Sequence, residues 1–143
     1  LIDYTKPSTE KRFYILDLLQ KKLLLSTYVA HGRGSGDNYA VAFSNRPGSY
    51  QSSLGFFRTG DTYMGKNGYS LFLDGLEKGI NDKARERAIV VHGANYADPA
   101  VLKGQQRLGR SLGCPALPPD ISKQVIDTIK GGVLLYIYGL NKA

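Results

Sequence analysis

The amino-acid sequence predicts a mainly β fold, built as a β-sandwich or a barrel-like sheet with one or two short helices. Short runs rich in β-branched and aromatic residues alternate with Gly, Asn and Pro turns along the chain. Gly and Tyr recur between residues 49 and 75, in the pattern of short strands joined by tight turns that sandwiches and barrels show. The best helical segment is residues 119–130, where apolar residues repeat every fourth position.

Length and composition indicate an ordinary globular domain, which we expect to span residues 1–143. The chain contains 42% hydrophobic and 22% charged residues, and a chain of this length buries enough surface to fold without disulfide or metal staples. Its longest apolar runs fall well short of the roughly 20 residues that cross a bilayer. With two histidines and one cysteine that are not closely spaced, it offers no metal cluster, and we expect no cofactor.

The formal net charge of +7 favours anionic partners. The basic residues are scattered in short runs mixed with Gly, Gln and Glu, and no basic helix with interleaved aromatic residues is present. We therefore expect a solvated basic surface and no nucleic-acid partner.

In the first half of the chain the patterns predict strands and loops. Residues 12–17 and 22–30 form the two strands of a predicted hairpin. Residues 31–38, HGRGSGDN, have the composition of a loop, and residues 39–43, YAVAF, predict another short strand. The glycines of residues 31–36 fit neither a P-loop nor a dinucleotide fingerprint.

The second half mixes strands with helices. Residues 77–87 are polar and fit either a short helix or an exposed loop, and residues 88–93 predict a buried strand. Asp98 as N-cap and Pro99 at the first helical position predict a short helix. The main helix, residues 119–130, precedes a last strand at residues 133–139.

The only cysteine, Cys114, stands between Gly113 and Pro115. A lone thiol is a small buried apolar group, a partner for another chain, or a nucleophile. A nucleophilic thiol of ordinary pKa needs a base, and the candidates are His31 and His92. Each is followed by glycine at the end of an apolar run, and His92 closes a predicted strand, where rigid scaffolds place catalytic groups.

The residues around Cys114 suggest further roles. Gly113 permits a positive φ or a close approach of substrate, so the N–H groups of Gly113 and Cys114 are candidates for an oxyanion hole. Arg107 and Arg110 lie just upstream and could lower the thiol pKa or hold a substrate carboxylate. A solvated surface role for the two arginines remains the alternative.

Residues 90–117, VVHGANYADPAVLKGQQRLGRSLGCPAL, resemble the catalytic signature of the YkuD-type L,D-transpeptidases. That family has His-Gly at a strand end, followed after a spacer by Ser/Thr-His-Gly-Cys. The chain is especially similar to the murein L,D-transpeptidase catalytic domain subgroup, in which Ser-Leu-Gly-Cys-Pro is usual. The resemblance extends back through residues 26–36 and 43–57 and so covers nearly the whole chain.

The resemblance implies a role for each matching residue. Cys114 matches the nucleophile and His92 the general base, while Gly93 matches the position whose carbonyl orients the imidazole. Gly113 and Ser111 match the glycine before the nucleophile and the first residue of the motif. The implied fold is the family's β-rich, sandwich-like catalytic domain.

Two positions depart from the family pattern. Leu112 stands where the family has a second histidine, and residues 115–117 lack the arginine that often follows the cysteine. Arg107 or Arg110 could supply the arginine contact to substrate. His31 could replace the missing imidazole from another loop, although a structural histidine that holds residues 31–36 in place is the alternative.

The implied reaction is acyl transfer on peptidoglycan stem peptides, through a thioacyl-enzyme at Cys114 and with formation of 3→3 cross-links. The same enzyme would be an L,D-carboxypeptidase with water as acceptor, and a non-catalytic peptidoglycan-binding domain is the alternative that Leu112 favours. The family resemblance further implies acylation by carbapenem inhibitors. We expect a monomer that works in the periplasm or, secreted, in the cell wall, with a signal peptide outside this chain.

Overall fold

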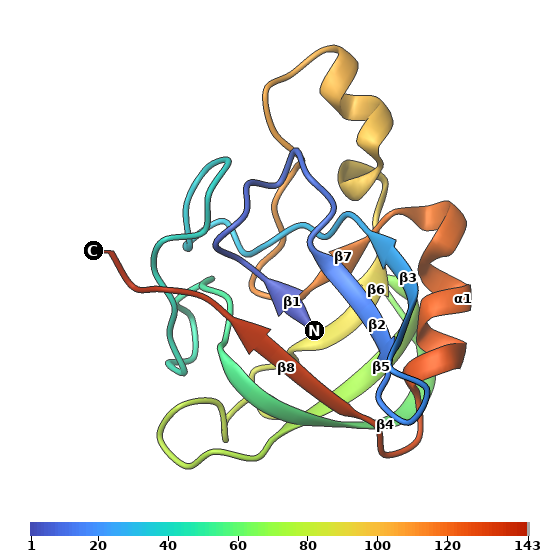
Figure 1. Cartoon of the computed structure of the whole chain (residues 1–143). Helices are drawn as coiled ribbons and strands as arrows, with labels where there is room; N and C mark the ends of the chain where they lie inside the picture. The colour runs from blue at the N-terminus through green and yellow to red at the C-terminus, as the bar shows by residue number, and fades with distance from the viewer. Residues whose placement is uncertain (143) are drawn as a thin grey trace.

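A computed structural model describes residues 1–142 and places every strand in one curled, mixed sheet (Figure 1). The strand order is β3-β2-β1-β8-β4-β5-β6-β7. The strands are β1 (Ile2–Asp3), β2 (Phe13–Asp17), β3 (Lys22–Thr27), β4 (Gly55–Gly65), β5 (Gly68–Gly75), β6 (Val90–Gly93), β7 (Ala116–Leu117) and β8 (Leu134–Tyr138). The helices are α1 (Pro119–Ile129) and the short 3₁₀ turns η1 (Asn95–Ala97) and η2 (Pro99–Lys103).

The sheet curls until its two ends approach each other. Ala30, just after β3, pairs with Ala116 of β7 at the opposite end of the strand order, through backbone N–O distances of 2.8 and 3.3 Å. This closure leaves few free edges and makes the sheet barrel-like. The prediction of a mainly β, barrel-like fold with short helices is thereby confirmed.

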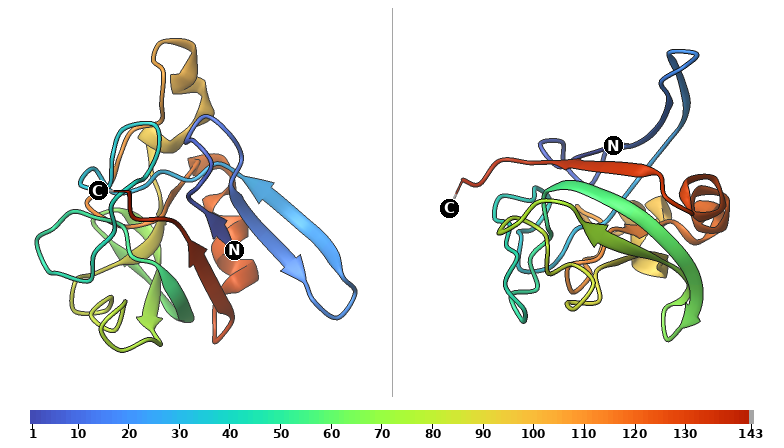
Figure 2. Two further views of the ribbon diagram at one scale, coloured as in Figure 1. Left: turned by 60° about the vertical axis from the view of Figure 1, so that its left-hand side comes forward. Right: turned by 90° about the horizontal axis from the view of Figure 1, so that it is seen from below.

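Most of the predicted elements are present. The first two predicted strands form the β2–β3 hairpin, which projects from the body of the molecule (Figure 2). Asp98 accepts a hydrogen bond from the N–H of Ala100 at 2.9 Å and so caps η2 as predicted. Helix α1 buries Val125, Ile126 and Ile129 against the sheet, where it packs on β6 and β5.

One segment differs from its prediction, and another takes one of its two predicted forms. Residues 39–43 do not form a strand, and Phe43 makes only an isolated bridge with Ser52. The carbonyl of Ser35 instead accepts the N–H groups of Val41 and Ala42, which folds the segment back on itself. Residues 77–87 are a run of turns, the exposed-loop alternative, in which the buried Asn81 amide donates to backbone carbonyls beside β4.

The core lies inside the curled sheet and under α1. Its members come from nearly every strand and from the helix; the largest fully buried apolar ones are Tyr4, Phe13, Phe57, Ile2, Leu71 and Leu73. None of the helices in residues 1–142 has the length and apolar character needed to cross a membrane.

Candidate active site

Cys114 and His92 line the same pocket, which has a volume of about 520 Å³. The pocket is lined by residues of β6, of the β4–β5 turn and of the loop before β7. Its wall combines the sequence-predicted residues with others, and comprises Tyr63, Lys66, Asn67, Arg87, Ala88, Ile89, Val90, His92, Tyr96, Arg110, Ser111, Leu112 and Cys114.

His92 is fixed by its strand and by its own neighbour. It lies on β6, paired with Ser70 of β5 on one side and with Ala116 of β7 on the other. Its Nδ1 lies 2.9 Å from the carbonyl oxygen of Gly93. Because a carbonyl only accepts, Nδ1 carries the proton and Nε2 is the basic nitrogen. Burial lowers the pKa of His92 and the Gly93 carbonyl partly offsets this, so the ring is neutral at pH 7.

The thiol of Cys114 is held by backbone groups just before and at the start of β6. Sγ donates to the carbonyl of Ala88 at 3.3 Å and accepts the N–H of Val90 at 3.4 Å. Burial raises the pKa of Cys114, while the Val90 N–H and the positive charge of Arg87 lower it. The net direction is upward, so the resting group is a neutral thiol that needs a base to become a nucleophile.

In the loop that carries Cys114, the backbone conformation and the close surroundings at position 113 admit only a glycine. Its φ is +128°, and a Cβ there would lie 3.0 Å from both the Gln51 carbonyl oxygen and the Ile89 side chain. Ser111 stabilises the loop, because its hydroxyl donates to the Cys114 carbonyl at 2.6 Å and accepts the Gly113 N–H at 3.1 Å.

This geometry changes the expected oxyanion hole. The Gly113 N–H is bonded to Ser111 Oγ at 3.1 Å, so of the two N–H groups predicted as oxyanion-hole candidates it is the less available. The Cys114 N–H donates to no acceptor within residues 1–142 and remains the candidate donor.

Residues 31–36 support the nucleophile loop through their backbone. Ser111 donates its N–H to the His31 carbonyl at 2.9 Å and accepts the Arg33 N–H at 2.8 Å. A Cβ on Gly32 would lie 2.8 Å from the Cα of Gly113, so the two backbones approach too closely for a side chain. The HGRG segment is therefore a packing platform for the cysteine loop.

His31 is not among the residues that line the pocket, and both of its ring nitrogens are engaged elsewhere, which argues against the expectation that it contacts substrate or replaces the missing imidazole. Arg12 donates to its Nδ1 at 2.9 Å, and its Nε2 lies 3.1 Å from the Gly36 carbonyl oxygen. The side chain is only 1% exposed. Burial, aided by the charge of Arg12, lowers the pKa of His31 to about 4, so the ring stays neutral with both nitrogens engaged.

The two upstream arginines separate in space. Arg110 lines the pocket and donates to Asp37 at 3.1 Å. Arg107 lies outside the pocket wall and donates to the Leu108 carbonyl at 2.9 Å, so the expectation that it binds substrate is not supported. Leu112 is 57% exposed at the pocket wall, where its apolar side chain offers no proton-transfer group.

Sequence reasoning missed Arg87, which reaches the pocket from the turn before β6. Its guanidinium donates to the Ser44 carbonyl, to Ser53 Oγ and to the Gln51 carbonyl, all at 2.8 Å. Residues 77–87 were predicted as a polar short helix or an exposed loop, and that pattern does not distinguish Arg87 from its charged neighbours. The one available signal was its position directly before the apolar strand that ends in His92.

Residues 1–142 contain no cluster of three or more His, Cys, Asp or Glu side chains that could hold a metal ion. Asp37 is paired instead with Arg110 of the pocket wall.

Comparison with solved structures shows the fold of this chain in larger proteins. The helical cell shape determining protein Pgp2 from Campylobacter jejuni is 14% identical, with a TM-score of 0.55 over 85% of this chain and 41% of that one. An L,D-transpeptidase from Mycobacterium smegmatis is also 14% identical, with a TM-score of 0.48 over 82% of this chain and 50% of that one. The chain thus spans half or less of these matched proteins.

A search of curated proteins found no match. A family model described as the L,D-transpeptidase catalytic domain matches residues 1–138. That match covers almost all of the chain and includes every residue of the pocket. The chain belongs to the L,D-transpeptidase catalytic domain family.

Proposed function

We propose that the protein is a cysteine-dependent peptidoglycan L,D-transpeptidase that uses Cys114 as nucleophile and His92 as general base. The observation that carries the proposal is that both side chains line one pocket, with Nδ1 of His92 bound by the Gly93 carbonyl. That bond leaves Nε2 as the nitrogen that takes a proton. The family match supplies the reaction class.

In the first step, the Cys114 side chain rotates so that its S–H group leaves the Ala88 carbonyl. Nε2 of His92 then takes the proton from Sγ. The thiolate attacks the carbonyl between the diamino acid and the terminal D-Ala of a tetrapeptide stem, and the Cys114 N–H stabilises the oxyanion. Collapse breaks the peptide bond, and His92 returns its proton to the leaving amine of D-Ala.

In the second step, the side-chain amine of another stem attacks the thioester. His92 takes a proton from that amine and delivers it to the departing thiolate, which leaves a 3→3 cross-link and regenerates the thiol. Because Leu112 cannot transfer protons, His92 serves both steps alone.

The charge of the pocket supports an anionic donor. Lys66, Arg87 and Arg110 all line it, and a tetrapeptide stem ends in a carboxylate that such cations bind. Since peptidoglycan lies outside the cytoplasmic membrane, the proposal includes a periplasmic or cell-wall location. It also includes acylation of Cys114 by carbapenems, a property of the family.

Product analysis by mass spectrometry tests the proposal directly. The chain is incubated with purified disaccharide-tetrapeptide beside a Cys114→Ala variant of equal thermal stability. A dimer joined 3→3 with loss of one D-Ala, absent with the variant, is the expected result. Tripeptide alone would show a carboxypeptidase that uses the same site. Absence of both products, together with absence of an acyl adduct on Cys114, would contradict the enzyme and favour a peptidoglycan-binding domain.

A further inference from the structure

The β2–β3 hairpin projects from the body of the molecule and ends in exposed apolar side chains (Figure 2). Leu19, in the turn that joins the two strands, is 97% exposed, and Leu23 and Leu24 of β3 are 56% and 54% exposed. Exposed aliphatic side chains that gather at one place, unlike scattered ones, mark an interaction surface. We call residues 19–24, LQKKLL, the hairpin tip.

The exposure of the leucines on β3 follows from how the hairpin leaves the sheet. In a strand with one face on the core, successive side chains alternate between core and solvent, yet the neighbours Leu23 and Leu24 are both more than half exposed. Ile15 pairs with Leu25 and Leu16 with Leu23, so Leu24 is the extra residue of a bulge. This end of the hairpin therefore lies beyond the core, and its leucines are available to another surface.

The turn that presents Leu19 is fixed by its own hydrogen bonds. The carboxylate of Asp17 accepts the N–H groups of Leu19 and Gln20, both at 3.1 Å. An aspartate that binds the backbone two residues ahead stabilises a tight turn. The tip is therefore ordered before it binds anything, which lowers the entropy cost of binding.

The charge of the hairpin tip complements an anionic surface. Lys21 and Lys22 are both exposed and lie between the leucines in the sequence. Asp17 is the one carboxylate within residues 13–27, and it already accepts two backbone N–H groups. The whole chain carries a formal charge of +7. Aliphatic side chains beside lysines suit the interface of an anionic bilayer, where the apolar groups reach the acyl chains and the ammonium groups meet the phosphates.

A second copy of this chain fits the hairpin tip less well. Strand β3 is first in the strand order and so has a free edge that could pair with another chain. Lys22 and the bulge at Leu24 both lie on that edge, and lysines and bulges disfavour pairing between sheet edges. Two copies that each carry +7 also repel each other.

We propose that the hairpin tip is a membrane-binding element for bilayers that contain anionic phospholipids. Leu19, Leu23 and Leu24 enter the boundary between head groups and acyl chains, and the two adjacent lysines bind lipid phosphates. The attachment is peripheral, since none of the helices of residues 1–142 could span a bilayer.

Membrane binding by the hairpin tip is independent of the proposed reaction. It uses none of the residues that line the pocket of Cys114. Cys114→Ala is therefore expected to bind vesicles as tightly as the parent chain, so failure of the reaction and failure of membrane binding are distinguished.

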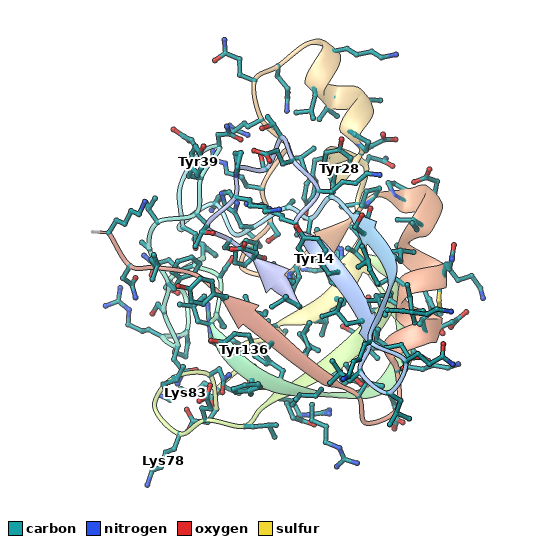
Figure 3. All side chains as sticks on the ribbon, in the orientation of Figure 1. Tyr14, Tyr28, Tyr39, Lys78, Lys83 and Tyr136 are labelled. Carbon is teal, nitrogen blue, oxygen red and sulfur yellow. The ribbon has the colours of Figure 1, made fainter. Side chains whose placement is uncertain are left out.

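Sedimentation with vesicles tests the role of charge. The chain is expected to bind vesicles of equal phosphatidylglycerol and phosphatidylcholine at least about tenfold more tightly than vesicles of phosphatidylcholine alone. Lys21→Gln/Lys22→Gln should weaken binding to the anionic vesicles about tenfold or more, because each lysine near an anionic surface contributes a factor of about five. The matched control, Lys78→Gln/Lys83→Gln, removes the same charge from the loop after β5, across the molecule from the hairpin (Figure 3), and should bind nearly as the parent does.

Paired substitutions of exposed aliphatic residues test the role of the leucines. Leu19→Ser/Leu23→Ser should weaken binding to the anionic vesicles at least about thirtyfold. The matched control, Leu76→Ser/Ile80→Ser, removes exposed aliphatic side chains outside the hairpin and should have little effect. Melting temperatures near that of the parent show that each variant is folded.

A tryptophan reports insertion directly, because the chain contains none. The emission of Leu19→Trp should shift to the blue on anionic vesicles, whereas that of Leu76→Trp should not. No vesicle binding by the folded parent, equal binding by the tip variants and their matched controls, or an unshifted Leu19→Trp spectrum would each overturn the proposal. A dimer in light scattering without lipid, lost in Leu19→Ser/Leu23→Ser, would also overturn it, because a second copy would then cover the tip.

Discussion

His31 and His92 look alike in the sequence but differ in what their ring nitrogens contact. Each precedes a glycine after an apolar run, and each is almost fully buried, at 1% and 3% exposure. In His31 both nitrogens are bound, by Arg12 and by the Gly36 carbonyl. In His92 only Nδ1 is bound, by Gly93, and the ring lines the pocket of Cys114. Burial alone thus does not separate a structural histidine from a candidate base, whereas the number of engaged ring nitrogens does.

Replacing each histidine separately is expected to give the largest effects, on acylation for His92 and on stability for His31. His92→Gln should slow acylation of Cys114 by donor tetrapeptide about 10²- to 10⁴-fold, while the melting temperature stays near that of the parent. His31→Leu should leave the activity of the folded fraction unchanged but lower the free energy of unfolding by about 2 kcal/mol, because Arg12 and Gly36 each lose a buried partner.

Single-turnover acylation followed by mass spectrometry, and urea denaturation of the same samples, measure the two effects. The comparison fails if His31→Leu abolishes acylation without loss of stability, or if His92→Gln retains full acylation.

A change of pH should separate the histidines in a second way. Because the folded pKa of His31 is lowered to about 4 from an ordinary 6.5, the unfolded chain binds more protons between these values. Stability from this group is therefore complete above pH 6.5 and is lost as the pH falls toward 4, by about 3 kcal/mol. His92, whose pKa is also lowered, should keep acylation active below the pKa of an ordinary histidine.

Urea denaturation at several pH values between 4 and 7 measures the free energy of unfolding. In the matched control His31→Leu, this free energy should depend less on pH. An equally steep loss of stability in His31→Leu would assign the effect to other groups. An acid limb of acylation centred above pH 6.5 would contradict the lowered pKa of His92.

The smallest expected difference concerns the two arginines that approach Asp37. Arg110→Ala should raise the KM for donor tetrapeptide about three- to tenfold with little change in kcat, because Arg110, unlike Arg107, lines the pocket. Arg107→Ala removes the same charge outside the pocket and should leave both constants unchanged. Steady-state kinetics of the two variants test this prediction. Equal KM values for the two variants would contradict a role of Arg110 in substrate binding.

Local signals in the sequence predicted much of the fold. The β2–β3 hairpin, the capped η2 and helix α1 each follow from short-range patterns: alternating strand residues, an Asp-Pro start, and an apolar repeat. Residues 39–43 had the composition of a strand but have no strand beside them, so tertiary context overrode propensity.

The sequence by itself determined which residues could carry the chemistry. One cysteine and two histidines leave few choices for a nucleophile and a base, and the glycine before Cys114 permits a positive φ there. These are properties of residue type and of neighbours along the chain, so they can be predicted without the fold.

The family resemblance already favoured His92 as the base, and the tertiary structure places His92, and not His31, in the wall of the pocket that contains the thiol. Only the tertiary structure placed Arg110 and Arg87 at the pocket wall and Arg107 outside it, and it engaged the Gly113 N–H with Ser111. These outcomes depend on contacts between residues far apart in sequence, such as Arg12 with His31 and Arg87 with Gln51. The physical reason is that ring and backbone polar groups, once buried, must be paired within the protein, and the partners exist only after the sheet has closed.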